Sequence, residues 1–299
     1  MEQAVHGGEA SYEIVPRQDL DFCLDGDIPR YWLGGDPFKT RFFDAMSCLF
    51  PEGEKFFIAC VRDYKDQITD PEMIQQVKDF TRQEGQHGMV HTKFNNRLHQ
   101  QGIDVPKILK MQTDIMFGFF RKHFPRTFTL GQTAAAEHMT AIMAHGFFRQ
   151  HDLMATADPR IRAMYAWHAI EEIEHKAVAY DVLKKVAKAS YFMRIVAMMQ
   201  VSFNFPMHVF MIMRHMFRVD GFSFRQRFGM WLRGLWWLYK PGGLYLPIMG
   251  HYLAYYKPGF HPWQGGQMQS YGIWRSTYDS TGDPIAAGDA MHAASLAAA

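Results

Sequence analysis

One pattern occurs twice in this chain: Asp-Pro, twelve further residues, and then Glu-x-x-His. The two copies span residues 70–87 and 158–175, and they end in the pairs Glu84 with His87 and Glu172 with His175. An Asp-Pro step is typical of a helix start, because Asp caps free N–H groups and Pro is tolerated in the first turn. Residues three apart in a helix lie on the same face. Each copy therefore predicts a helix that directs one carboxylate and one imidazole to the same point.

The residue types in this repeat bind first-row divalent metals through oxygen and imidazole nitrogen. In ferritin-like di-iron and di-manganese bundles, two helices each supply Glu-x-x-His and two others each supply one Glu. Glu54 and Glu137 fit the single-Glu positions, since they lie 30 and 35 residues before the Glu of each copy, which leaves room for one helix to end and the next to return. The sequence thus predicts a two-metal site with these ligands: Glu54, Glu84, His87, Glu137, Glu172 and His175.

Two acidic residues compete with these assignments. Glu52 lies two residues from Glu54, near the expected helix start, where an acid also interacts favourably with the helix dipole. We prefer Glu54, and Glu52 stays an alternative. Glu171 is four residues before His175 and lies on the same face, but the constant offset of 88 residues between the two copies selects Glu172.

Further polar residues lie close to the predicted ligands. His91 follows His87 by four residues, and His168 precedes Glu172 by four, so both lie on or near the ligand faces. We expect His91 and His168 to hydrogen-bond to ligand side chains or to act as acid and base, while direct metal ligation and a purely structural role remain open. Three acids either orient ligands or have a plain surface role: Glu171, Glu174 and Asp181.

The chain contains the stretches PRYWLGGDP, FPEGEKFF, QEGQHGMVH, AAEHMTAI, WHAIEEIEHKAVAYDV and YKPGFHPW. Together they resemble the bacterial family catalogued as predicted metal-dependent hydrolases, which is placed near the ferritin-like superfamily. The resemblance covers about residues 28 to 265. It implies a metal-dependent protein, and its ferritin-like pattern, carried onto this chain, gives the same ligands. It implies no particular substrate.

Composition agrees with an intracellular metalloprotein. With 299 residues, the chain can bury a large core as one big domain or two small ones. Cys23, Cys48 and Cys60 are too few and too scattered for a disulfide framework or a cysteine zinc site, which favours a reducing compartment. A net charge of +2 argues against nucleic-acid binding. No apolar h-region is visible near the N-terminus, so no signal peptide is expected.

The hydrophobic pattern predicts an all-α fold, because no stretch shows sustained strand alternation. Residues 1–44 are expected to form an irregular lead-in, and residues 45–190 a ferritin-like four-helix bundle. The expected bundle helices cover about residues 51–68, 71–101, 130–151 and 159–189, with a crossover helix over about residues 105–124. Residues 191–265 are expected to form an apolar, aromatic-rich helical extension, and residues 266–299 a small-residue tail.

The extension contains an uncharged stretch, residues 195–213, that is about as long as a bilayer core requires. Gln200, Asn204, Pro206 and His208 within it argue against a membrane span. The Arg, Trp and Phe residues that follow are typical of an interfacial helix. Three interpretations remain open: a core helix of a soluble protein, a helix in peripheral contact with a membrane, and a true span.

Ligand charge leads to a functional hypothesis. Four carboxylates and two neutral imidazoles nearly balance two divalent ions, and this balance suits a ferrous pair that reacts with O₂. The leading hypothesis is therefore a di-iron oxidase or oxygenase that acts on an apolar organic substrate, since the chain holds 21 Met and 25 Phe. The alternative that the resemblance implies is a metal-dependent hydrolase with a metal-bound hydroxide as nucleophile. A second alternative is a non-catalytic metal-binding or membrane-associated protein.

These hypotheses set the expected cofactors and partners. The expected cofactors are two metal ions, with Fe(II)/Fe(III) first and Mn or Zn as alternatives. The expected partners are a small apolar substrate, O₂ and an electron donor, without nucleic acid, while peripheral membrane contact and a homodimer remain open. The expected location is the cytoplasm, on the inner face of the membrane if the apolar extension contacts it.

Overall fold

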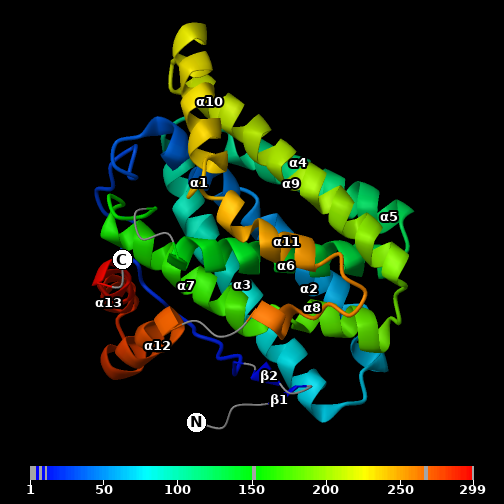
Figure 1. The fold of residues 1–299 in the computed structure, drawn as a ribbon. Coiled ribbons are helices and arrows are strands. Elements are labelled where there is room, and N and C mark those ends of the chain that lie inside the picture. Colours follow the sequence, from blue (N-terminus) through cyan, green and yellow to red (C-terminus); the bar gives the residue numbers. More distant parts are fainter. Residues whose placement is uncertain (1–4, 7–8, 11, 150–152, 266–268, 298–299) are drawn as a thin grey trace.

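The fold consists mainly of helices (Figure 1). The computed structural model describes residues 5–6, 9–10, 12–149, 153–265 and 269–297. Among these residues, the strands are β1 (Val5–His6) and β2 (Glu9–Ala10), which pair antiparallel and are two residues long each. The prediction of an all-α fold is confirmed.

The predicted metal ligands lie on helices that surround a common centre. These helices are α2 (Phe50–Arg62), α3 (Pro71–Gln100), α6 (Arg126–Arg149) and α7 (Pro159–His175). α2 packs against α3 and α6, and α7 packs against the same two helices. Figure 1 shows α6 and α7 side by side across the middle of the molecule. The contacts give the helices a shared interior, while the assignment to the ferritin-like superfamily stays a prediction.

The aspartates of the repeated pattern begin α3 and α7, as predicted. The Asp70 carboxylate accepts the backbone N–H of Glu72, and the Asp158 carboxylate accepts the backbone N–H of Arg160. Such caps satisfy N–H groups that have no partner within the helix. Because each cap sets where its helix begins, it also sets which face the Glu-x-x-His residues occupy further along.

The connection from α3 to α6 contains a π-helix. It consists of α4 (Val105–Thr113), η2 (Asp114–Phe120) and α5 (Arg121–His123). The sequence predicted one regular helix over about residues 105–124, and the π-helical turn of η2 departs from that prediction. A π-helical turn is wider than an α-helical turn and frequently occurs at functional sites.

The last helix of the predicted bundle is shorter than expected. α7 ends at His175, and the chain continues as α8 (Val178–Asp181) and the π-helical η3 (Val182–Val186) rather than as one helix to residue 189. The break allows this segment to contact the turn at residues 260–261. There the Tyr180 hydroxyl donates to the backbone oxygen of Phe260, and Asp181 lies 3.2 Å from Nε2 of His261.

Two other helices differ from their expected bounds. α2 ends at Arg62 rather than near residue 68, and η1 (Lys65–Gln67) follows it. Asp63, directly after α2, pairs with Arg121 of α5 at 2.9 Å, which holds the end of α2 to the crossover. α6 begins at Arg126 instead of near residue 130, and its expected end at residue 151 lies outside the described residues.

The predicted lead-in and tail contain more helix than expected. α1 (Pro37–Ser47) begins within the lead-in, because the Asp36 carboxylate caps it by accepting the N–H groups of Phe38 and Lys39. The predicted tail forms α12 (Gln269–Thr281) and α13 (Pro284–Ala297). α13 packs against α7, so the small residues in it serve close helix packing rather than an irregular tail.

The C-terminal extension is dominated by one long helix. Its elements are α9 (Tyr191–Val219), α10 (Phe224–Tyr239), η4 (Leu246–Ile248), α11 (Met249–Ala254) and η5 (Pro262–Gly265). Among the described residues, α9 is the one helix long and apolar enough to cross a membrane by length and composition, and 28% of its most apolar window is buried. Large apolar side chains are exposed on α9 and α10: Phe192, Met199, Phe203, Phe224, Phe228 and Trp236. Membrane contact and a cytoplasmic location stay predictions.

The contact between α13 and α7 can be tested with a matched pair of glycines. A Cβ on Gly288 would lie 2.8 Å from the backbone Cα of Ala163, whereas a Cβ on Gly272 of α12 would meet nothing within 4 Å. We expect Gly288→Ala to lower the free energy of unfolding by about 1–3 kcal/mol, because two helix backbones must separate. Gly272→Ala should raise it by up to about 1 kcal/mol through helix propensity. Denaturant unfolding measures both, and equal stabilisation of the two variants would contradict the packing described here.

Candidate metal centre

The structure brings the predicted ligands together in the interior. α2 carries Glu54, α3 carries Glu84 and His87, α6 carries Glu137, and α7 carries Glu172 and His175. All of these side chains are buried, with at most 4% of each residue exposed. Their role as ligands stays a prediction, but their meeting point is an observed feature of the fold.

Three overlapping groups of side chains can each hold a metal ion. In each group the ligand atoms lie within 4.8 Å of one another. The groups are Glu84 with Glu137 and His175, Glu84 with His87 and Glu172, and Glu54 with His87 and His168. Glu84 belongs to two groups, and a carboxylate shared in this way can bridge two ions. His168 joins the last group in addition to the six predicted ligands.

Several polar atoms in this cluster are shielded from water without a well-aligned hydrogen bond: both carboxylate oxygens of Glu54, Glu84 and Glu137, Nδ1 of His87 and Nε2 of His175. Nε2 of His175 lies at ion-pair distance from Glu84 and Glu137, at 3.1 and 3.3 Å. Buried polar groups are almost always hydrogen-bonded, and leaving one unpaired costs about 1–3 kcal/mol, or more for a charged group. Buried charges are normally paired or coordinate a metal. The donor set of carboxylates and imidazoles therefore fits divalent metal ions.

The cluster holds more acids than bases, and the crowding shifts their pKa values. Burial raises the pKa of Glu54 and Glu84 well above the usual range, and neighbouring carboxylates raise both further. Burial and the charge of Glu172 raise the pKa of Glu137 to about 7. Burial alone would also raise the pKa of Glu172, but contacts with His168 and His175 outweigh it and hold that pKa well below the usual range. A cation at the centre would relieve the repulsion among these acids.

Each predicted histidine ligand is oriented by a residue of the opposite helix. Nε2 of His87 on α3 lies 3.1 Å from Oε2 of Glu171 on α7. Nδ1 of His175 on α7 lies 2.8 Å from Oε1 of Gln83 on α3. Gln83 and Glu171 occupy equivalent positions in the repeat, since they too are 88 residues apart. Such outer partners fix the ring orientation of metal-binding histidines.

Arg17 joins these two orienting contacts. Its guanidinium donates to Oε1 of Glu171 at 3.0 Å and to Oε1 of Glu174 at 2.8 Å, and Glu174 accepts from Nε2 of Gln83 at 2.7 Å. The Tyr271 hydroxyl of α12 also donates to Glu174, at 2.9 Å. Glu171 and Glu174 are fully interior, with 0% and 1% exposed, so the alternative of a surface role is wrong.

Sequence reasoning missed Gln83 and Arg17. The 88-residue offset, applied to the position before each motif Glu, would have paired Gln83 with Glu171. Arg17 has no comparable signal, because it lies in an irregular segment 154 residues before Glu171. Of the acids with an open role, Asp181 is the one held elsewhere, between His261 and Lys185.

Glu52 and Glu54 point to different surroundings. Oε1 of Glu52 pairs with Lys55 at 2.6 Å, and its Oε2 accepts the Thr113 hydroxyl at 2.7 Å, so Glu52 faces the crossover. Glu54 lies in the cluster instead, and Gly88 of α3 leaves the space for its carboxylate. A Cβ on Gly88 would lie 3.0 Å from Oε2 of Glu54.

This close approach gives a test of the cluster that leaves the ligand residues unchanged. Gly88→Ala should weaken binding of Mn²⁺ or Zn²⁺ by about tenfold, because the new methyl group displaces the Glu54 carboxylate. Gly85→Ala on the same helix is the matched control, since a Cβ there meets nothing within 4 Å. Metal affinity is measured by competition with a chromophoric chelator. Equal affinities of the two variants would show that the position of Glu54 does not matter for metal binding.

The chain was compared with known proteins. A family model described as predicted metal-dependent hydrolase matches residues 16–266. No curated protein matches the chain. No solved structure matches it either.

The family description corrects the leading functional hypothesis. The hypothesis of a di-iron oxidase or oxygenase, with O₂ as oxidant, is wrong, because the matched family is described as hydrolytic and no comparison supports oxygen chemistry. The types of ligand alone led to the wrong reaction, because carboxylates and imidazoles suit several metals and more than one reaction. The resemblance noted in the sequence is confirmed. The match covers most of the 299 residues, and this chain belongs to the family of predicted metal-dependent hydrolases.

Proposed function

We propose that this protein hydrolyses its substrate with the help of two divalent metal ions held by Glu54, Glu84, His87, Glu137, Glu172 and His175. The observation that carries the proposal is the set of buried atoms on these side chains that lack hydrogen-bond partners. Membership of the family supports the reaction class. Mn²⁺ and Zn²⁺ are the ions to test first, because both act as Lewis acids in two-metal hydrolases.

Metal ions bound here would polarise a substrate carbonyl and make water more acidic. The protein's own side chains shape the approach to that position. The Thr140 hydroxyl donates to Oε2 of Glu172, which leaves the orientation of this carboxylate little freedom. The ring of Phe50 lies against those of His91 and His168, with centroids 4.6 and 4.7 Å apart, and so limits access of water to this side.

A chain of hydrogen bonds determines the tautomer of His168. The Asn95 amide donates to the backbone oxygen of Ser47, so its Oδ1 is free to accept the Ser47 hydroxyl. The Ser47 oxygen, 2.8 Å from Nδ1 of His91, therefore accepts from His91. Nε2 of His91 is then an acceptor, and it receives the N–H of Nδ1 of His168 at 2.7 Å.

The other nitrogen of His168, Nε2, faces the cluster and lies 3.0 Å from Oε1 of Glu172. Two such atoms at this distance need a proton or a cation between them, so Nε2 is a place where a proton can be held. We assign His168 as the base that accepts a proton from water and returns it to the leaving group. His91 is its positioning residue, and direct ligation by His168 is the competing role.

The proposal predicts separate losses of metal and of activity. Glu84→Ala should remove most bound metal and the hydrolysis of p-nitrophenyl esters, while far-ultraviolet circular dichroism shows unchanged helix content. His168→Asn should lower kcat/KM by about 10²–10⁴ and retain the metal. Glu52→Ala is the control, because Glu52 faces Lys55 and Thr113 rather than the cluster.

Elemental analysis and ester hydrolysis are measured on the same preparations. A full metal load in Glu84→Ala would refute the ligand assignment. A wild-type protein that is loaded with Mn²⁺ or Zn²⁺ and hydrolyses no ester or amide would refute the reaction class. Loss of metal in His168→Asn would make His168 a ligand instead of the base.

The acidic cluster also predicts how pH changes the effect of metal on stability. The pKa of Glu137 is about 7 in the metal-free fold, against 4.5 as the usual value. Because the folded protein binds the Glu137 proton more tightly than the unfolded chain does, this group contributes stability that is fully present below pH 4.5. The contribution is lost as the pH rises through about 7. The pKa values of Glu54 and Glu84 are raised in the same way.

Because metal replaces these protons, Mn²⁺ should raise Tm more at pH 8 than at pH 5.5. Calorimetric melting with and without Mn²⁺ measures the difference. Glu137→Gln removes the titrating group and should reduce the dependence of the metal-free Tm on pH. An equal rise in Tm at both pH values would contradict the described charge balance.

A further inference from the structure

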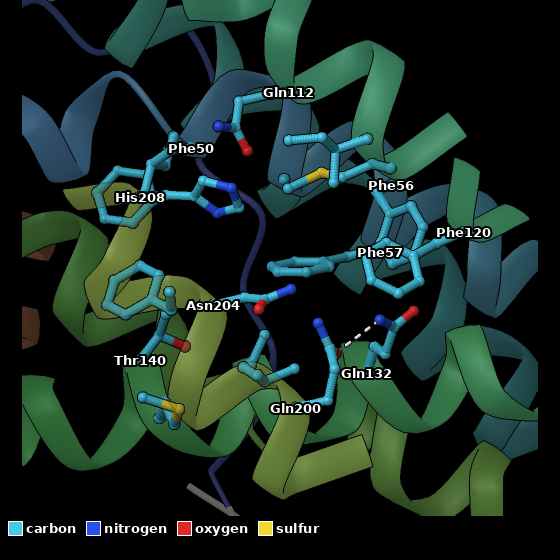
Figure 2. A pocket seen from close by; sticks show the side chains of 18 residues that line it. Phe50, Phe56, Phe57, Gln112, Phe120, Gln132, Thr140, Gln200, Asn204 and His208 are labelled. Atoms are coloured by element: carbon cyan, nitrogen blue, oxygen red, sulfur yellow. Dashed lines mark hydrogen bonds between the residues drawn. The ribbon is translucent and has the colours of Figure 1, made fainter. Parts of the chain in front are cut away.

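Two pockets adjoin one another beside the candidate metal centre. The proximal pocket includes Glu172 and His168 in its wall. The distal pocket lies between α2, α6, α9 and the α4–η2 segment (Figure 2). Phe50, Thr140 and Phe205 line both pockets, so these side chains mark the place where the two pockets meet.

The lining of the distal pocket is mostly apolar, and its polar side chains include a row on α9. Gln200, Asn204 and His208 follow one another every four residues, so they form a stripe on the face of α9 that lines the pocket. Gln132 of α6 donates to Oε1 of Gln200 at 2.7 Å, so this end of the stripe already has a partner. Elsewhere α9 buries mainly apolar side chains. The polar stripe is therefore confined to the part of the helix that lines the pocket, where its groups can bind a ligand.

Gln112 of α4 lies across the pocket from this stripe, and it is the clearest sign of a ligand. Its side chain is buried, with 1% exposed, and neither its amide nitrogen nor its amide oxygen has a hydrogen-bond partner. Figure 2 shows the amide of Gln112 directed into the hollow, with Asn204 and His208 facing the same space. A buried amide without partners costs about 1–3 kcal/mol. A ligand group that both donates and accepts hydrogen bonds would satisfy it.

The wall of the distal pocket carries no formal charge. None of the described residues that line it is Asp, Glu, Lys or Arg, and burial lowers the pKa of His208, which keeps it neutral. A carboxylate, phosphate or ammonium group placed here would lose its hydration without gaining a counter-ion, which costs far more than an unpaired amide. The pocket therefore selects against ionised groups.

We propose that the substrate is an uncharged ester or amide with an extended apolar body and, away from the scissile bond, a second non-ionised group such as a hydroxyl or amide that binds Gln112 in the distal pocket. This inference rests on the proposed hydrolysis. The scissile carbonyl lies in the proximal pocket, near Glu172 and His168, and the apolar body passes Phe50 and Phe205. The widened π-helical turn of η2 contributes Ile115, Met116 and Phe120 to the far wall.

The reaction is an ordinary acyl transfer to water. The bond between the acyl carbon and the leaving oxygen or nitrogen breaks, and a bond between that carbon and the water oxygen forms. One proton of the water moves to the leaving group through His168. The other is released to solvent when the product acid ionises. No oxidant or reductant takes part.

The kinetic test uses p-nitrophenyl esters of acids with six to twelve carbons that differ only at the far end, which is methyl, hydroxyl or carboxylate. With the metal-loaded wild type, the hydroxyl series should exceed the methyl series in kcat/KM by about three- to tenfold. The carboxylate series should fall at least tenfold below the methyl series. In Gln112→Leu the order of hydroxyl and methyl should reverse, whereas Gln100→Leu, an exposed control, keeps the wild-type order.

A binding experiment makes the outcome independent of catalysis. Calorimetry compares 1,8-octanediol with 1-octanol, and the diol should bind more tightly to the wild type but not to Gln112→Leu. Hydrolysis without a preference for the hydroxyl ends, or with a preference for carboxylate, would overturn the pocket assignment and leave the proposed function intact. Diol preference without hydrolysis of any ester would refute the proposed function and retain the pocket assignment. If Gln112→Leu melts far below the wild type, Asn204→Leu takes its place in both experiments, with the same expected results.

Discussion

Mutual repulsion among buried carboxylates is the constraint that shapes the centre of this protein. Four acids and two imidazoles meet where water is excluded, and burial together with Glu172 raises the pKa of Glu137 to about 7. Such a cluster is stable only if protons or cations supply positive charge. Neighbouring groups keep the acids in place: Gly88 leaves space for Glu54, and Thr140 donates to Glu172. The fold therefore holds these carboxylates in an arrangement whose charge can be balanced either by protons or by metal ions.

The repeat in the sequence corresponds to reciprocal support between α3 and α7. The residue before the motif Glu of each helix contacts the motif histidine of the other, as Gln83 does for His175 and Glu171 does for His87. Arg17 links both contacts through charged hydrogen bonds. Neither helix can rotate or slide without disturbing the histidine of its partner. The two copies thus act as one unit, and the position of each imidazole depends on both.

Local features of the sequence were enough to predict which side chains meet in the cluster, but not what surrounds the cluster. The Asp70 and Asp158 caps and the three-residue spacing of Glu and His depend on helix geometry alone, which is why the predicted residues converge. The break after His175, the π-helix of η2 and the helices near the C-terminus depend on distant contacts, such as that of Gly288 with Ala163, which no local pattern shows. Reaction type was also beyond the sequence, because the same donors serve oxidative and hydrolytic metals.

The contact between Tyr271 and Glu174 has a consequence for how the protein is made. The predicted ligands lie between residues 54 and 175, so the ribosome has made all of them before it reaches α12. Glu174, which holds Gln83 and Arg17 in position, nevertheless receives a hydrogen bond from a residue that emerges almost 100 positions later. A nascent chain therefore holds the predicted ligands before it has their full support. The residues around the candidate metal centre reach their final arrangement only after α12 has been made and has packed.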